Sequence, residues 1–304
     1  MSHGDIVPDA EAGCQQDRRR FWYDSGLCRR KGLNNSFDLL VVDIDGTIID
    51  AGGNISADDK AAIAATQKRG VRVALSTGRV IEACRGIIAE LELDGVHIFF
   101  DGAAVYDLSA GSMVYSRPVS RTTLEPAVEF ARANRIYLEL YALDRYFVEE
   151  INWAEKVHRE FFGLTANLAD FDEIIDRETI IKCELMIHNE AEEAGAALFL
   201  KYFEGRLTGS VARTPAYPEM KFINVVEPDV SKGAALVQLA EHFKIPLERI
   251  MAIGDGTNDI PLFQQAGLKV AMGNAHDELK ALADYVTGTV DDSGVASAIE
   301  RYLL

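Results

Sequence analysis

The chain has 304 residues and a formal net charge of −17. Hydrophobic residues make up 48% and charged residues 26% of it, a balance typical of packed domains, and the length suffices for two domains. The negative charge repels nucleic acid and anionic membranes, so we expect neither as a partner. It also repels phosphorylated substrates at long range. A phosphate site in this chain therefore needs local cations, namely a metal ion, a lysine or helix N-termini.

The first 36 residues mix Gly, Asp and Gln with basic clusters at Arg18–Arg20 and Arg29–Lys31. Neither a strand period nor a helix period persists there, so we predict a disordered extension. No apolar stretch is long enough to span a membrane, and no apolar segment typical of a signal peptide begins the chain. The four cysteines show no spacing typical of zinc ligands, and we interpret them as reduced thiols: Cys14, Cys28, Cys84 and Cys183. We expect a cytoplasmic protein.

A regular pattern of apolar runs and amphipathic segments begins at Phe37. Short apolar runs indicate buried parallel strands, and the segments between them have helical composition, with Ser56 as the N-cap of the first. The predicted strands are residues 37–42, 71–75 and 97–100, and the predicted helices are residues 56–69 and 80–91. Strands that alternate with helices are typical of a doubly wound sheet.

The middle of the chain follows another pattern, in which strands are adjacent in sequence. Adjacent strands favour antiparallel pairing, so this region is predicted to be a separate α+β unit. Its predicted helices are residues 122–134, 153–162 and 191–203, and its predicted strands are residues 136–141, 146–151, 180–187, 207–213 and 221–225.

Alternating helices and strands return after Lys232. The predicted helices are residues 233–243, 259–265, 276–283 and 294–303, and the predicted strands are residues 250–253, 268–272 and 285–287. The simplest fold is an α/β, mostly parallel Rossmann-like core with an inserted α+β cap. We predict an extension over residues 1–36, a discontinuous core over residues 37–117 and 214–304, and a cap over residues 118–213.

Two aspartates directly follow the first predicted strand, in the sequence Asp43-Ile44-Asp45-Gly46-Thr47. Side chains alternate along a strand, so Asp43 and Asp45 should project to the same side at its end. Carboxylates suit Mg²⁺, which prefers hard oxygen ligands. A carboxylate can also attack phosphorus, while a second one moves protons. An Asp- and Gly-rich turn without function is the competing interpretation.

Three further groups follow other predicted strands or begin a helix. The sequence Ser76-Thr77-Gly78-Arg79 offers a hydroxyl and backbone N–H groups to a phosphate, although a helix cap explains it equally well. Lys232 begins a helix, where the helix dipole disfavours a cation, so an anionic partner is expected. In Gly254–Asp259, Asp255 could complete a Mg²⁺ site with Asp259 as its support. The spacing and terminal Glu of a calcium-binding EF-hand are absent there.

Taken together, the four groups resemble the motifs of the haloacid dehalogenase-like phosphatases, and in particular the Cof-type members with a type II cap of subtype B. The resemblance covers residues 37–304 and includes Ala271–Ala275. It implies that Asp43 is the nucleophile and Asp45 the general acid/base. It also implies a Mg²⁺ ion bound by Asp43, by the backbone carbonyl of Asp45 and by Asp255, with Asp259 behind the metal.

The resemblance implies a phosphate site as well. Thr77, the neighbouring Gly78 and Lys232 would hold the transferring phosphoryl group, with Lys232 also contacting Asp43, and Asn258 would touch the phosphate. One position departs from the family, which has Asn-Gly-Ala after the third strand where this chain has Asp101-Gly102-Ala103. An ionised Asp only accepts hydrogen bonds, whereas Asn also donates them, so no role follows for Asp101.

These observations favour a phosphatase for small phosphorylated metabolites such as sugar phosphates, acting as a monomer or homodimer. Asp45 supports hydrolysis or mutase chemistry, because transport ATPases of the superfamily that the chain resembles usually carry Thr there. Two alternatives stay open: a sugar phosphomutase similar to phosphomannomutase, and a non-catalytic ligand-binding or regulatory protein of this fold. The cap should select the substrate, through some of Glu139, Tyr141, Arg145, Tyr146, Trp153, His158, Lys182, Glu184 and His188.

Overall fold

The computed structural model describes Met1, residues 37–212 and residues 217–304. The predicted extension over residues 1–36 lies outside the described residues apart from Met1. In the described part of the chain, no helix is both long and apolar enough to cross a membrane.

The core is built on a five-stranded parallel sheet. The order of its strands is β14-β13-β12-β1-β2, so β1 is flanked by β12 and β2. All four residues of β1 are buried, as the apolar run predicts. The strands are β1 (Leu39–Val42), β2 (Arg72–Leu75), β12 (Ile250–Gly254), β13 (Leu268–Ala271) and β14 (Tyr285–Val286). The doubly wound, mostly parallel core is therefore confirmed.

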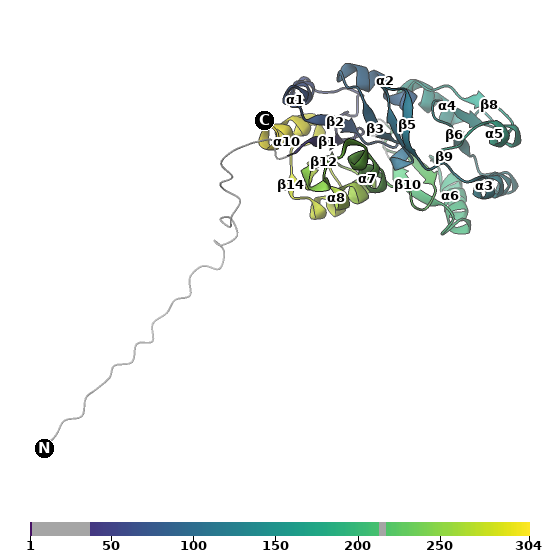
Figure 1. Ribbon diagram of the computed structural model, residues 1–304. Helices are drawn as coiled ribbons and strands as arrows, with labels where there is room; N and C mark the ends of the chain where they lie inside the picture. Colours follow the sequence, from purple (N-terminus) through teal and green to yellow (C-terminus); the bar gives the residue numbers. More distant parts are fainter. Residues whose placement is uncertain (2–36, 213–216) are drawn as a thin grey trace. The chain divides into compact units, whose positions relative to one another are not determined.

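Helices connect these strands. Ser56 caps the first of them, since its Oγ accepts a hydrogen bond from the Asp59 N–H at 3.0 Å. The Asp59 carboxylate in turn accepts from the Ala296 N–H at 2.7 Å, which joins the first and last helices side by side (Figure 1). The core helices are α1 (Ala57–Lys68), α2 (Ile81–Glu90), α7 (Lys232–Phe243), α8 (Ile260–Gln265), α9 (Asp277–Leu282) and α10 (Gly294–Tyr302).

The third predicted strand differs from the expectation. β3 (Val96–Phe99) meets the end of β2 through a single parallel bridge, between Ser76 and Ile98. Its ladder is instead antiparallel, to β4 (Ala104–Asp107), which pairs with β5 (Ser112–Ser116). The strands β4 and β5 were not predicted, because they are short and lack a continuous apolar run.

The cap is an α+β unit inserted, in sequence, between the two parts of the core. In Figure 1 its teal elements lie together to the right of the purple and yellow elements of the core. Its sheet has the order β10-β11-β9-β6-β7-β8. The strands are β6 (Glu139–Tyr141), β7 (Tyr146–Val148), β8 (Asn167–Leu168), β9 (Lys182–Ile187), β10 (Thr208–Ala212) and β11 (Lys221–Val226). The helices are α3 (Arg121–Asn134), α4 (Trp153–Val157), α5 (Phe171–Arg177) and α6 (Glu190–Tyr202).

One expectation about the cap needs correction, and one of its helices was not predicted. The cap sheet includes β11, which pairs antiparallel with both β10 and β9, so the cap extends to Val226 and the boundary at residue 213 lies too early. The short helix α5 was not predicted. The predicted strands over residues 136–141 and 146–151 are present as the antiparallel pair β6 and β7, although each has only three residues.

Candidate active site

Lys232 lies between two carboxylates at the carboxyl end of β1. Its Nζ donates to Asp43 Oδ1 and to Asp259 Oδ1, both at 2.6 Å. The lysine is only 1% exposed. Burial disfavours the charged amine, but Asp259 and Asp43 outweigh burial and raise the pKa of Lys232. The ammonium group is therefore held charged against Asp43.

The acidic side chains around this lysine outnumber it. Burial raises the pKa of Asp43 well above its ordinary value; Asp259 and Asp255 add to the rise, while Lys232 opposes it. Burial, followed by the charge of Asp259, raises the pKa of Asp255 to about 7. A second cation at this place would relieve both effects. The charges of the site thus fit a bound metal ion.

The oxygens of Asp43, Asp255 and Asp259 lie within 4.8 Å of one another, so the three carboxylates could hold a metal. Both carboxylate oxygens of Asp259 are already engaged in hydrogen bonds. Its Oδ1 accepts from Lys232, and its Oδ2 accepts from the N–H groups of Asp255 and Gly256, each at 3.1 Å. Asp43 and Asp255 therefore have the oxygen atoms available to a metal, and Asp259 orients the loop that carries Asp255.

The two acidic loops approach each other closely at Gly46. This residue has φ +80°, and a Cβ there would come 2.3 Å from Asp255 Oδ2. Only glycine fits both restrictions. The Asn274 Nδ2 donates to the Gly46 carbonyl at 2.7 Å, and Thr47 Oγ1 donates to Asp255 Oδ1 at 3.3 Å. Thr47 from the first loop and Asn274 from the loop after β13, which also donates to Asp255 Oδ2 at 3.4 Å, thus fix the position of the Asp255 carboxylate.

The residues predicted to hold the phosphate share one pocket with these carboxylates. It encloses about 380 Å³ and is lined on the core side by Asp43, Asp45, Thr77, Gly78, Asp255 and Asn258. Lys232 does not line the pocket but contacts Asp43, which does, and Asp259 contacts Lys232. Thr77 is buried, and its Oγ1 accepts from the Arg79 N–H at 3.1 Å. The structure therefore brings together every predicted core residue of the site.

Arg79 is a member of the site to which the sequence assigned no role. Its Nε donates to Asp45 Oδ2 at 2.9 Å and its Nη2 to Asp45 Oδ1 at 2.6 Å. The guanidinium group also lies over the rings of Phe161 and Phe162 in the cap, 5.1 and 5.0 Å from their centres. The predicted acid/base residue is therefore held by an arginine that contacts the cap.

The cap side of the pocket is part aromatic and part polar. Of the nine cap residues considered from the sequence, four line it: Tyr141, His158, Lys182 and Glu184. The cap also contributes Phe162, Leu164, Val211, Lys221, Phe222 and Asn224, which carried no sequence signal. Trp153 and His188 pack on each other elsewhere, and Arg145 pairs with its neighbour Asp144.

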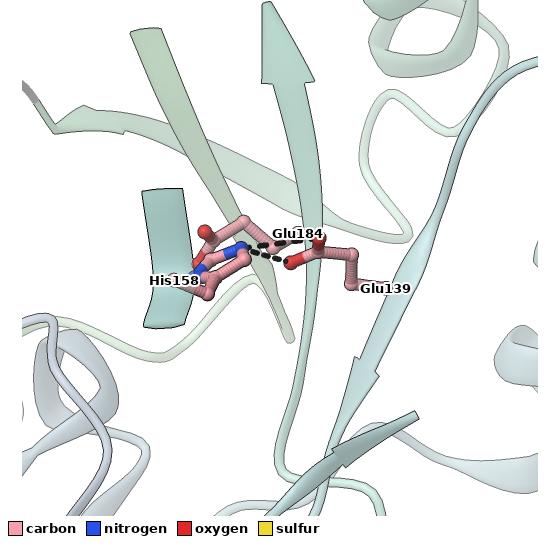
Figure 2. A group of neighbouring side chains, drawn as sticks. All are labelled: Glu139, His158 and Glu184. Carbon is pink, nitrogen blue, oxygen red and sulfur yellow. Dashed lines mark hydrogen bonds and ion pairs between the residues drawn. The ribbon is translucent and has the colours of Figure 1, made fainter. Parts of the chain in front are cut away.

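Two of these lining residues, His158 and Glu184, form a buried cluster with Glu139 (Figure 2). The His158 Nε2 lies 2.9 Å from Glu139 Oε2, and the dashed lines in Figure 2 join these two side chains. Burial disfavours a charged imidazole, but the Glu139 carboxylate outweighs it and raises the pKa of His158. The Glu139 carboxylate also accepts from Tyr141 Oη at 2.8 Å, which fixes the ring of a residue that lines the pocket.

The ligand atoms of this cluster also lie within 4.8 Å of one another. A metal is not required there, because cations of the protein already balance the acids. The Lys182 Nζ donates to Glu184 Oε2, and His158 is paired with Glu139. Lys182 also donates to Asn224 Oδ1 and, at 3.3 Å, to the Gly78 carbonyl of the core. We therefore interpret the cluster as a rigid polar wall of the pocket.

Comparison with known proteins shows relatives along nearly the whole described chain. The phosphatase YwpJ of Bacillus subtilis is 25% identical over 285 residues, which cover 87% of this chain and 99% of that protein. A second protein of B. subtilis, the 5-amino-6-(5-phospho-D-ribitylamino)uracil phosphatase YcsE, is 28% identical over 267 residues, which cover 88% of this chain and 96% of that one.

A solved structure has the same fold. The haloacid dehalogenase-like hydrolase from Bacteroides thetaiotaomicron matches with a TM-score of 0.76 and 26% identity, over 87% of this chain and 99% of that one. The haloacid dehalogenase-like hydrolase family matches residues 40–299. This range contains both parts of the core, the inserted cap and all the site residues described above. The chain therefore belongs to the haloacid dehalogenase-like hydrolases.

Proposed function

We propose that the chain is a Mg²⁺-dependent phosphatase that hydrolyses small phosphorylated metabolites through a phosphorylated Asp43. The observation that carries the proposal is the contact between Asp43 and Lys232 at the floor of a pocket that Asp45, Thr77, Asp255 and Asn258 also line. The proposed nucleophile, acid/base residue, phosphate-binding groups and metal ligands thus lie around one pocket.

In the proposed first step, a carboxylate oxygen of Asp43 attacks phosphorus and the bond from phosphorus to the ester oxygen breaks. Asp45 gives its proton to the leaving oxygen. Lys232 keeps one oxygen of Asp43 engaged, so that the other can face the substrate. Mg²⁺, held by Asp43 and Asp255 with the Asp45 carbonyl, would supply positive charge to the phosphoryl oxygens.

In the second step, water attacks the phosphorus of phosphorylated Asp43 and gives a proton to Asp45, and the bond from phosphorus to Asp43 breaks. The Arg79–Asp45 pair suits this step, because the guanidinium donates to both oxygens of Asp45 and so favours the carboxylate, which is the form that takes a proton from the water. For the first step, Asp45 must leave Arg79 in order to carry a proton. Movement of the cap, which contacts Arg79 through Phe161 and Phe162, would accompany that change.

The cap wall supports a small leaving group with hydroxyl or amide groups. Lys182, Glu184 and Asn224 offer donors and acceptors, while Tyr141, Phe162 and Phe222 offer apolar surface. Two B. subtilis relatives are named 5-amino-6-(5-phospho-D-ribitylamino)uracil phosphatases, and a relative from Methanothermobacter thermautotrophicus is named phosphoglycolate phosphatase. Both of these substrates belong in a test panel beside sugar phosphates.

The test is release of inorganic phosphate from this panel, with Mg²⁺ present and with Mg²⁺ removed by EDTA. We expect Mg²⁺-dependent release from at least one small phosphate ester. Conversion of a sugar phosphate to an isomer without phosphate release would indicate a mutase instead. Binding of panel members without either reaction would indicate a non-catalytic protein.

A further inference from the structure

Asp101, which stands where the resembling family usually has Asn, joins the core to the cap. Its Oδ2 accepts from Ser210 Oγ on β10 and from Asn224 Nδ2 on β11, both at 2.7 Å. Its Oδ1 accepts from Asn258 Nδ2 at 3.1 Å. Asp101 is 4% exposed. One buried carboxylate thus receives donors from two cap strands and from Asn258, which lines the pocket.

The direction of these hydrogen bonds is fixed by Lys182. Its ammonium group only donates, and it donates to Asn224 Oδ1, so the amide nitrogen of Asn224 must face Asp101. The amide of Asn258 likewise presents its nitrogen to Asp101. If residue 101 were an asparagine, its amide nitrogen would face the amide nitrogen of Asn224 or of Asn258. Two donors would then face each other, and no hydrogen bond could form between them. The surroundings of Asp101 therefore require an acceptor at both of its oxygens.

The backbone holds this carboxylate in place. Asp101 has φ +53°, a left-handed conformation that is unfavourable for residues other than glycine. Its N–H donates to the Thr77 carbonyl at 2.9 Å, which ties it to the predicted phosphate loop. The next residue, Gly102, packs so closely that a Cβ would come 2.2 Å from the Ser231 carbonyl oxygen, at the start of α7. Asp101 is thus anchored between the segments that carry Thr77 and Lys232.

We infer that Asp101 is a positioning residue that directs the amide of Asn258 at the phosphate and ties that orientation to the seating of β10 and β11 in the cap. The inference rests on the proposed function for its effect on turnover. We therefore expect that loss of a hydrogen bond from β10 or β11 to Asp101 also changes the orientation of the Asn258 amide. Because the contact of Asn258 with phosphate persists from the bound substrate to the transition state, its loss should raise KM more than it lowers kcat.

The test exchanges the carboxylate of Asp101 in the core and the amide of Asn224 in the cap. In Asp101→Asn, an amide nitrogen faces either Asn224 or Asn258, and one of these hydrogen bonds is lost. In the double variant Asp101→Asn with Asn224→Asp, the new amide can donate to the cap carboxylate and still accept from Asn258. The double variant also keeps the net charge of the wild type. KM for para-nitrophenyl phosphate and the inhibition constant of orthovanadate report on the phosphate end without a specific leaving group.

We expect both constants to rise about tenfold in Asp101→Asn, the cost of a lost hydrogen bond in a charged site, and to return towards wild type in the double variant. Ser210→Ala should raise KM in the same direction, and Thr208→Ala, an exposed change on the same strand, should not. Constants within about twofold of wild type in Asp101→Asn, or a double variant that behaves like the single one, overturn the inference.

A second readout separates this inference from the proposed function. Amide hydrogen exchange in residues 208–212 and 221–226 should be faster in Asp101→Asn than in wild type, and should slow again in the double variant. If wild type hydrolyses no phosphate ester, the proposed function fails, and exchange alone decides the link between core and cap. Equal exchange in wild type and Asp101→Asn would then overturn it.

Discussion

Arg79 holds both carboxylate oxygens of Asp45, with its Nε 2.9 Å from Oδ2 and its Nη2 2.6 Å from Oδ1. The pair is largely buried, since the side chains are 7% and 22% exposed. The same guanidinium lies over two phenylalanine rings of the cap. The arginine therefore links the orientation of the proposed acid/base residue to the position of the cap.

Substitution of this arginine tests the link. In Arg79→Lys, a single ammonium group cannot hold both oxygens of Asp45 or stack on the rings in the same way. We expect kcat to fall by at least about tenfold, with KM within about threefold of wild type, because proton transfer is affected more than binding. Arg85→Lys is the matched control, since Arg85 is exposed and pairs with Glu82 on the surface. Equal kcat in the two variants would show that Arg79 has no part in orienting Asp45.

Lys232→Met should abolish phosphate release and also weaken the fold. Removal of the ammonium group leaves Asp43 and Asp259 buried without their shared partner. Breaking a buried ion pair in this way costs about 3–5 kcal/mol, which urea unfolding would measure. Lys60→Met, which removes an exposed pair with Glu90, should cost less than about 1 kcal/mol. A folded Lys232→Met enzyme with wild-type turnover would contradict the proposed role of Lys232.

Metal binding should stabilise the folded chain, because Asp43 and Asp255 are crowded by like charge in its absence. At a Mg²⁺ concentration of one hundred times Kd, we expect about 2.7 kcal/mol of added stability. The measurement is the shift of Tm on addition of MgCl₂. Asp255→Asn should remove the shift, whereas Asp229→Asn, at an exposed surface pair, should keep it. An equal shift in wild type and Asp255→Asn would exclude Asp255 as a ligand.

Protonation of the buried His97 should destabilise the fold at acidic pH. Burial lowers its pKa from 6.5 to about 4, and its Nδ1 accepts from the Leu75 N–H at 3.1 Å. The unfolded chain therefore binds more protons between about pH 6.5 and about pH 4, so stability falls as the pH falls through this window. The loss is on the order of 3 kcal/mol. His97→Gln keeps an acceptor and does not titrate, so its unfolding free energy should fall less over the same window. Parallel curves for the two proteins would contradict this.

Much of the fold could be predicted because its signals are local. The apolar run of β1, the Ser56 cap of α1 and the alternation of strands with helices each depend on neighbouring residues. Parallel strands then bring their carboxyl ends to one edge, which placed Asp43, Thr77 and Asp255 in one pocket. The core of the site followed from the topology.

The contacts that were not predicted depend on pairs distant in sequence. Asp101 meets Ser210 and Asn224 across 109 and 123 residues, and Arg79 meets Asp45 across 34. No local pattern records such partners. The cap boundary failed for a similar reason, since β11 joins the cap by antiparallel pairing with β10 and β9. Side-chain partners and strand pairing across connections require the structure itself.

The role of Asp43 as nucleophile is the central claim. In Asp43→Asn, a neutral amide replaces a carboxylate whose ionisation is disfavoured by burial and by neighbouring acids. We therefore expect a folded protein with Tm no lower than that of wild type in the absence of metal, so that any loss of activity reports on chemistry.

The most direct measurement is hydrolysis of para-nitrophenyl phosphate by wild type and Asp43→Asn at saturating Mg²⁺. The proposed mechanism predicts Mg²⁺-dependent turnover in wild type and none above background in the folded variant. Turnover by Asp43→Asn at the wild-type rate would contradict it, because an amide cannot form the proposed phosphorylated intermediate.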